Sequence, residues 1–220
     1  MHYLGLALYA EGPSDYRFLC PLLLRLCEEA CSSATQPVDI GDVLALGDPI
    51  ERADGSRADR IAQAAVDAAP AWNVLFVHAD ADSDAVAAMR DRVLPGLSRL
   101  MTSGLARAEG VAVVPVRVTE AWTLADGDAL RAVFGTILGD DQLGLAAHGR
   151  GVEQLTDPKQ VLEAACAAAL PRGRRHRMKV GYFLNALGEE VSLQRLRDLP
   201  SFARLESDLV DALRRLQILG

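Results

Sequence analysis

The chain has 220 residues, of which 50% are hydrophobic and 24% are charged. A chain of this length and composition buries a sizeable core, which excludes wholesale disorder and allows one α/β domain with or without a small helical addition. The formal net charge of −7 gives no overall attraction to nucleic acid, although metal-binding acidic residues and a locally basic surface would still suit a nuclease.

The first predicted element is a strand at residues 3–9. This apolar run has no basic region before it and stops at Glu11, so we expect a strand and not a secretory signal. A glycine–proline pair then breaks the strand, and Ser14 is expected to cap a helix with Asp15 in its first turn. Apolar residues spaced four apart predict that this helix continues to Cys31.

The chain then alternates between predicted strands and helices. We expect strands at 38–46, 73–77 and 111–116, and helices at 57–69, after residue 84, and after Thr119. The run at 73–77 is typical of a central parallel strand that is buried on both faces. Pro70 should end one helix, and Pro95 should kink the next. This alternation predicts a doubly wound, mostly parallel α/β sheet of the Rossmann-like kind.

The pattern changes after residue 133. Residues 134–156 are rich in glycine and weakly periodic, whereas a helix is expected at 158–170 and an apolar stripe from Phe202 to Leu216 predicts a final helix. We therefore divide the chain into an α/β core at 1–133 and a loop and helical extension at 134–220 that packs on the same domain.

Cysteine usage and hydropathy bear on the compartment. The spacing of Cys20, Cys27 and Cys31 on one predicted helix suits core packing and fits no zinc pattern, and the fourth cysteine is Cys166. No window approaches 18 apolar residues, so no membrane span is expected. We expect reduced thiols and a cytoplasmic location.

Acidic residues follow two of the predicted strands. Glu11 closes the first strand, Asp80 and Asp82 follow the run at 73–77, and Asp84 comes next. If the strand continues, Asp80 and Asp82 point to the same side with Cβ atoms about 7 Å apart. Gathered carboxylates repel each other by about 4 kcal/mol per pair at 4 Å and an effective dielectric near 20. A divalent cation would remove this cost, and oxygen ligands favour magnesium, manganese or calcium over zinc.

Each acidic feature also has a structural interpretation. Glu11 can be a polar turn residue, and the acidic triplet can cap the following helix. His78 can either support the ligands or pack in the core. The metal-binding interpretation is favoured because both acidic sites close a strand and open a helix, which is where open α/β sheets bind ligands.

Three segments resemble motifs of Toprim-related proteins. Residues 9–19, YAEGPSDYRFL, resemble the EGxTD/E…FL opening found in the nuclease domains of OLD (overcoming lysogenization defect) proteins and in the prokaryotic family DUF4276. Residues 77–84, VHADADSD, are similar to the Toprim DxD motif, and residues 115–126, PVRVTEAWTLAD, resemble the EAW box of DUF4276. Residues 157–159 and 178–182 look similar as well, so the resemblance spans nearly the whole chain.

The resemblance implies a Toprim-like fold and specific roles for the acidic residues. It implies metal ligation by Asp80 and Asp82, and a metal-binding or acid–base role for Glu11. Asp84 would be an outer ligand. Glu120 would add a carboxylate at the next strand end, with a first-turn residue favoured by the helix dipole as its structural alternative.

One dense basic cluster precedes the last predicted helices. Its arginines are candidate phosphate contacts, and a solvated loop is the alternative. These nucleic-acid-binding candidates are Arg172, Arg174, Arg175 and Arg177. The resemblance to OLD-type Toprim nucleases, which have a lysine near the metals, implies that Lys179 is the catalytic candidate of this region.

These observations predict a metal-dependent phosphodiesterase, a Toprim-type nuclease that cuts DNA or RNA with two Mg²⁺ or Mn²⁺ ions about 3.5–4 Å apart. In related systems the Toprim module works with an ABC- or OLD-type ATPase in prokaryotic defence against phage. This chain has no GxxxxGK[ST] motif, so we expect such an ATPase as a partner. The alternatives are a non-catalytic Toprim-fold binding subunit and a haloacid-dehalogenase-like phosphatase that uses Asp80 and Asp82. Nucleic acid is the expected substrate partner, no membrane is expected, and a homodimer is left open.

Overall fold

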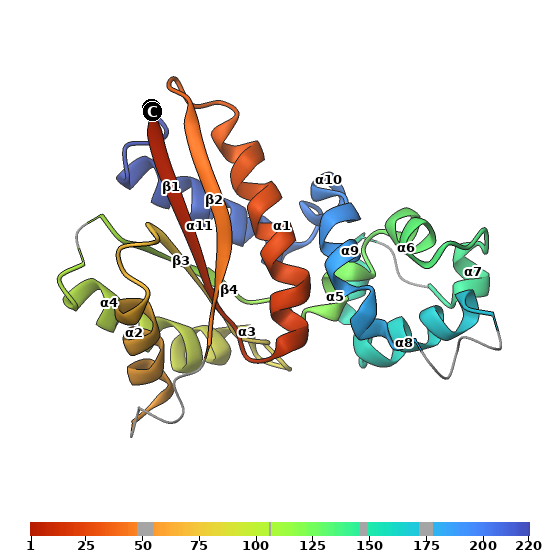
Figure 1. The fold of residues 1–220 in the computed structure, drawn as a ribbon. Coiled ribbons are helices and arrows are strands. Elements are labelled where there is room, and N and C mark those ends of the chain that lie inside the picture. The colour runs from red at the N-terminus through yellow and green to blue at the C-terminus, as the bar shows by residue number, and fades with distance from the viewer. Residues whose placement is uncertain (48–54, 106, 146–148, 172–177) are drawn as a thin grey trace.

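A computed structural model describes residues 1–47, 55–105, 107–145, 149–171 and 178–220. Its centre is a sheet of four strands in the order β2-β1-β3-β4, and every pairing between neighbours is parallel (Figure 1). The strands are β1 (His2–Tyr9), β2 (Val38–Leu46), β3 (Val74–His78) and β4 (Glu109–Val113). The predicted α/β fold with a parallel sheet is therefore confirmed. β4 ends three residues earlier than predicted.

Helices cover both faces of this sheet. The helices α1 (Pro13–Cys31) and α11 (Pro200–Arg215) share one apolar cluster with Leu6 and Leu8 of β1. The helices α2 (Arg57–Asp67) and α4 (Leu94–Thr102) share a second cluster with Ala7 and Tyr9. Because side chains alternate along a strand, these two clusters lie on opposite faces of the sheet.

Between the neighbouring strands β1 and β3, the direction in which the chain adds strands to the sheet reverses. From β1 the chain continues through α1 to β2 on one side, whereas from β3 it continues through α4 to β4 on the other side. The helices that follow these two strands lie on opposite faces, so the carboxyl ends of β1 and β3 mark the switch point of the sheet. Open α/β sheets bind their ligands at such a switch point. Glu11 and Asp80 follow these two strands.

The start of α1 differs from the prediction. The helix begins at Pro13 with Gly12 as its N-cap, so Ser14 is not the cap. Proline suits the first helical position because it has no N–H group to leave unpaired. Asp15 lies in the first turn as predicted, and its Oδ2 atom accepts a hydrogen bond from the Gly12 N–H at 2.9 Å. This contact turns the Asp15 side chain back toward the end of β1.

The helix after β3 is irregular before Pro95. It consists of α3 (Ala85–Ala87), a π-helical stretch η1 (Ala88–Val93) and α4, in which Pro95 occupies the first turn. A proline has no N–H and clashes with the carbonyl group four residues earlier, so the preceding turn widens. Stretches of π-helix are frequent at functional sites, and this one carries Arg92.

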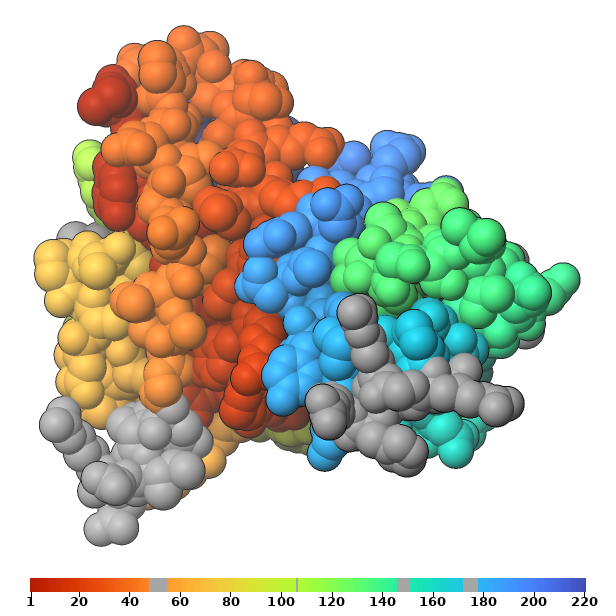
Figure 2. All heavy atoms as spheres, turned by 45° about the vertical axis from the view of Figure 1, so that its right-hand side comes forward, coloured from red at the N-terminus to blue at the C-terminus, as the bar shows by residue number. Residues whose placement is uncertain are grey.

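The later elements form a helical group beside the sheet (Figures 1 and 2). The elements of this group are α5 (Glu120–Thr123), α6 (Gly127–Phe134), α7 (Asp140–Leu143), η2 (Gly149–Gln154), α8 (Pro158–Ala169), η3 (Val180–Tyr182), α9 (Leu184–Glu190) and α10 (Leu193–Leu196). The predicted helix at 158–170 and the predicted final helix are both confirmed.

The helical group is fixed to α1 through α9. A Cβ atom at Gly188 would lie 2.3 Å from the backbone oxygen of Phe18, so only glycine permits this close approach. Arg25 of α1 also donates hydrogen bonds to the carbonyl groups of Gly188 and Val191, each at 2.9 Å. The described residues before and after position 133 share one apolar cluster, and the division at that position stays a sequence-based prediction.

Membrane insertion can be judged for the described helices. None of them has both the length and the apolar sequence that crossing a bilayer requires.

Candidate metal centre

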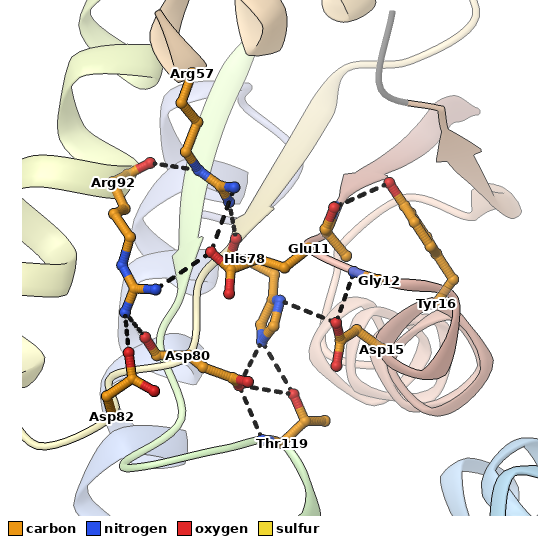
Figure 3. A network of polar contacts seen from close by, with 11 residues as sticks. Glu11, Gly12, Asp15, Tyr16, Arg57, His78, Asp80, Asp82, Arg92 and Thr119 are labelled. Atoms are coloured by element: carbon orange, nitrogen blue, oxygen red, sulfur yellow. Dashed lines mark hydrogen bonds and ion pairs between the residues drawn. The ribbon is translucent and has the colours of Figure 1, made fainter. Parts of the chain in front are cut away.

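Three side chains that could hold a metal ion meet at the carboxyl ends of β1 and β3. Asp15, His78 and Asp80 each offer one ligand atom, and these atoms all lie within 4.8 Å of one another. Asp15 comes from the first turn of α1, His78 is the last residue of β3, and Asp80 follows two residues later (Figure 3). The cluster therefore lies at the switch point of the sheet.

The imidazole ring of His78 lies between the two carboxylates and is fully buried. Its Nε2 atom is 3.2 Å from Asp80 Oδ1, and its Nδ1 atom is 3.9 Å from Asp15 Oδ2. The longer distance is beyond hydrogen-bonding range, and Nδ1 has no hydrogen-bond partner among the described residues. Ligand atoms on one octahedral ion are about 3 Å apart, so the three side chains, whose ligand atoms lie within 4.8 Å of one another, would have to draw together around an ion. With this movement, the residues present fit an ion.

Thr119 fixes the position of the Asp80 carboxylate. Its backbone N–H lies 3.0 Å from Asp80 Oδ1, and its hydroxyl group lies 3.3 Å from the same oxygen and 3.0 Å from His78 Nε2. Within the described ranges these contacts all use Oδ1, so the Oδ2 atom of Asp80 is left for a ligand. Thr119 is the N-cap residue of α5, which follows it as predicted, but its hydroxyl group contacts the cluster and makes no capping hydrogen bond.

The loops that follow β3 and β4 are joined by their backbones. Ala81 donates to the carbonyl group of Pro115 at 3.1 Å, and Asp82 donates to that of Arg117 at 2.8 Å. Asp82 and Arg117 both have positive φ angles, of 50° and 65°, which is uncommon for residues other than glycine. This pairing of the loops brings Thr119 to Asp80.

The left-handed backbone at Asp82 also determines where the DxD carboxylates point. The sequence places Asp80 and Asp82 on the same side only if the strand continues, and β3 ends at His78. The two carboxylates consequently have different partners, because Asp80 contacts His78 and Thr119 whereas Asp82 contacts Arg92.

Two arginines lie at the outer edge of the cluster. Arg92 Nη1 is 3.4 Å from Glu11 Oε1, and Arg92 Nη2 is 3.2 Å from Asp82 Oδ2 and also donates to the backbone carbonyl of Asp80. Arg57 Nη1 is 3.3 Å from the same oxygen of Glu11, and its Nη2 donates to the His78 carbonyl at 2.7 Å. The two guanidinium groups thus balance the negative charge of Glu11 and Asp82.

Two of the carboxylates lie in surroundings that disfavour their charge. Burial raises the pKa of Asp15, and His78 acts in the opposite direction. Burial also raises the pKa of Glu120, to which the charges of Asp80 and Asp15 add. A cation at the cluster would stabilise the ionised form of both carboxylates.

The other predicted site residues lie outside this cluster. Asp84 accepts a hydrogen bond from the Ala87 N–H at 2.9 Å and so caps α3, as its structural interpretation predicted. Lys179 and Glu120 line an adjoining pocket. The predicted phosphate contacts lie outside the described residues; these are Arg172, Arg174, Arg175 and Arg177. The structure thus brings Glu11, Asp80 and Asp82 to one edge of the sheet.

The sequence alone did not identify Asp15, Thr119, Arg57 or Arg92 as site residues. A signal for Asp15 was present, because the third position of a helix that follows Glu11 faces back toward the strand end. Arg57 and Arg92 lie on helices, and no sequence pattern predicts that these helices are placed beside the cluster.

Comparison of this chain with protein-family models, with curated proteins and with solved structures found no match. The resemblance to Toprim-related proteins therefore stays a prediction that rests on the three motifs. The structure itself shows a parallel α/β sheet with an Asp–His–Asp cluster at its switch point that could hold a metal ion.

Proposed function

We propose that this protein is a metal-dependent phosphodiesterase that acts on DNA or RNA. The observation that carries the proposal is the convergence of Asp15, His78 and Asp80 at the switch point of the sheet, with Glu11 and Asp82 beside them. Carboxylates gathered at such an edge typically hold the ions of phosphoryl-transfer sites, as in two-metal enzymes.

The donor atoms favour one of the two predicted metals. Asp15 and Asp80 supply oxygen ligands, which suit Mg²⁺ and Mn²⁺ alike, whereas His78 supplies an imidazole nitrogen. Magnesium strongly prefers oxygen ligands and retains its waters, and nitrogen ligands suit transition metals better. We therefore expect Mn²⁺ to support activity better than Mg²⁺ does. A bound ion supplies Lewis-acid activation of water and of the phosphate group.

The surrounding residues have separate tasks in this proposal. Thr119 holds Asp80 in one orientation through its N–H and hydroxyl groups. Arg57 and Arg92 are placed to bind the oxygens of a phosphate group, because guanidinium groups match phosphate geometry. Glu11 lies between the two arginines and would either bind a second ion or take up a proton from water.

One observation favours a second candidate, a non-catalytic subunit that binds nucleic acid or an ATPase. Glu11 and Asp82 are already paired with Arg57 and Arg92, so part of the predicted ligand set is neutralised without a metal. The expected ABC- or OLD-type ATPase partner belongs to both candidates, because the chain has no nucleotide-binding P-loop of its own.

A cleavage assay distinguishes the candidates. Purified protein is incubated with plasmid DNA, single-stranded DNA and tRNA in Mn²⁺, with and without an ATPase partner. The proposal predicts cleavage that Asp80→Asn and Asp15→Asn abolish. Asp42→Asn should leave cleavage unchanged, because Asp42 is exposed on the edge strand β2.

Two further outcomes of this assay have clear meanings. Loss of activity in Glu11→Gln supports the nuclease, whereas a phosphatase of the haloacid-dehalogenase kind should survive this change. If no substrate is cut with Mn²⁺ or Mg²⁺ under any of these conditions, the catalytic proposal is wrong and the binding subunit is the better description.

A further inference from the structure

A pocket of about 390 Å³ opens beside the candidate metal centre. Five elements line it: the first turns of α1, the start of α8, η3 with the residue before it, and the first residues of α5 and α9. Its polar and aromatic lining includes Ser14, Arg17, Glu120, Lys159, Lys179 and Tyr182. Its volume falls within the range of sites that take small ligands, so the pocket has room for one ligand of nucleotide size but not for a duplex.

The basic side chains of this pocket are suited to an anion. Within the described ranges, Lys159 and Lys179 form no ion pair, and both side chains are exposed. Arg17 donates a hydrogen bond to the Gly181 carbonyl at 3.0 Å and so ties η3 to α1. The carboxylates of Glu120 and Glu163 line the same pocket; burial raises the pKa of Glu120, and the charge of Lys159 acts in the opposite direction. The three cations therefore outnumber the two carboxylates, and lysine amino groups commonly bind phosphate as point charges.

The rim of the pocket carries an exposed aromatic ring. Tyr182 is 70% exposed, although large apolar side chains are usually buried. Its backbone N–H donates to the Lys179 carbonyl at 3.0 Å, so the ring and the amino group belong to one tight turn. An exposed aromatic ring beside cationic groups is the combination with which proteins bind single-stranded nucleic acid, because any base can stack on it.

The pocket adjoins the candidate metal centre. Glu120 lines the pocket, and the preceding residue, Thr119, donates to Asp80. Ser14 and Glu120 also line a small void together with Asp15 and Thr119. This adjacency suits a strand that has one phosphate at the metal centre and its neighbouring nucleotide in the pocket.

We propose that this pocket binds one unpaired nucleotide of the substrate, next to the phosphate group held at the metal centre. Lys159 and Lys179 contact its phosphate, and Tyr182 stacks on its base. A base can stack on this ring only when it is free of its complement, so the preferred substrate is single-stranded or frayed. The inference rests on the proposed function and adds the substrate class.

The test measures binding without cleavage. The fluorescence anisotropy of a short labelled single-stranded DNA and of its blunt duplex is recorded in Ca²⁺, across a range of salt concentrations. The double variant Lys159→Ala/Lys179→Ala should bind the single strand about tenfold more weakly, with a salt slope smaller by about 1. Tyr182→Ala should also weaken binding about tenfold, whereas Tyr182→Phe retains the ring and should bind like the wild type.

A matched control and a metal readout complete the design. Arg204→Ala removes an exposed cation of α11 that lies 3.7 Å from Asp208, and it should leave binding unchanged. The Mn²⁺-induced rise in melting temperature should persist in all pocket variants, because these residues are not metal ligands in the proposal.

The results separate this inference from the proposed function. Unchanged single-strand affinity in both the lysine and the tyrosine variants overturns the inference, even if the protein cleaves nucleic acid. Equal affinity for duplex and single strand, with no effect of Tyr182→Ala, overturns it as well. Weakened binding in the pocket variants supports it, and an absence of cleavage in the separate assay then counts against the catalytic proposal alone.

Discussion

The Nη1 atom of Arg92 lies 3.4 Å from the Oε1 atom of Glu11, where the metal-binding interpretation of Glu11 requires a cation. The other terminal nitrogen of Arg92 lies 3.2 Å from Asp82, so one guanidinium group bridges both carboxylates. An arginine thus supplies the positive charge that the sequence pattern attributes to a metal. Among the described residues, no guanidinium group pairs with the side chains of Asp15, His78 and Asp80; Arg92 and Arg57 donate to these residues only at the backbone carbonyl groups of Asp80 and His78.

Replacing Arg92 should strengthen metal binding. Its positive charge opposes the approach of a cation to Glu11 and Asp82, so Arg92→Gln should bind Mn²⁺ several-fold more tightly in a calorimetric titration. Arg90→Gln is the matched control, because Arg90 is exposed on the same π-helical stretch and pairs with Asp91 at 2.6 Å. Weaker Mn²⁺ binding in Arg92→Gln would show that Arg92 supports the metal site and does not compete with the ion.

Replacing Asp15 should remove metal binding without loss of stability. Burial raises the pKa of Asp15, so its ionised form costs folding free energy when no cation is present. Asp15→Asn should therefore unfold in EDTA at a temperature no lower than that of the wild type. The wild type should gain about 2.7 kcal/mol at a Mn²⁺ concentration of 100 times its Kd, and the variant should gain none.

Asp84→Asn is the control for this prediction. Asp84 caps α3, and asparagine caps helices about as well as aspartate does. Its Mn²⁺-dependent rise in melting temperature should equal that of the wild type. An equal loss in both variants would mean that the response reports general negative charge and not the buried cluster.

Thr119 should act on metal affinity through Asp80. Thr119→Val keeps the size and the backbone N–H of the residue but removes the hydroxyl group that contacts Asp80 and His78. Loss of such a supporting contact typically costs tenfold or more in metal affinity, so Mn²⁺ titration should show a drop of about tenfold. Thr119→Ser retains the hydroxyl group and should restore affinity; failure of this rescue would assign the effect to packing.

The thiol of Cys20 should react slowly at neutral pH. Burial raises its pKa to about 11, above the ordinary value of 9.0, so at pH 8 the thiolate fraction is about a hundredfold lower than that of an ordinary thiol. Alkylation by iodoacetamide, followed at Cys20 by peptide mass spectrometry, should be slow at pH 8 and accelerate up to about pH 11. Fast alkylation of the folded protein at pH 8 would contradict this.

Much of the fold could be predicted because it depends on local patterns. The apolar run before Glu11 and the continuous run before Asp80 have the lengths of buried strands, and helical periodicity follows each of them. Parallel order then places Glu11 and Asp80 at one edge of the sheet. These predictions need only the alternation of strands and helices.

The composition of the cluster could not be predicted in the same way. His78 joins it because β3 extends one residue beyond the predicted strand, which puts His78 on the α1 side together with Phe76. Thr119 joins through the pairing of two loops whose left-handed residues, Asp82 and Arg117, are not glycines. The position of Arg92 depends on a π-helical turn, which has a different period from the α-helix assumed for that segment.

The most direct test of the metal centre is a diffraction experiment on crystals soaked in Mn²⁺, with data collected at the manganese absorption edge. We predict an anomalous peak between Asp15, His78 and Asp80, with ligand distances near 2.1–2.3 Å. Such a peak should be absent from crystals of Asp80→Asn. A fully ordered wild-type cluster that shows no anomalous peak at saturating Mn²⁺, with the His78 ring still lying between the two carboxylates, would contradict the metal centre.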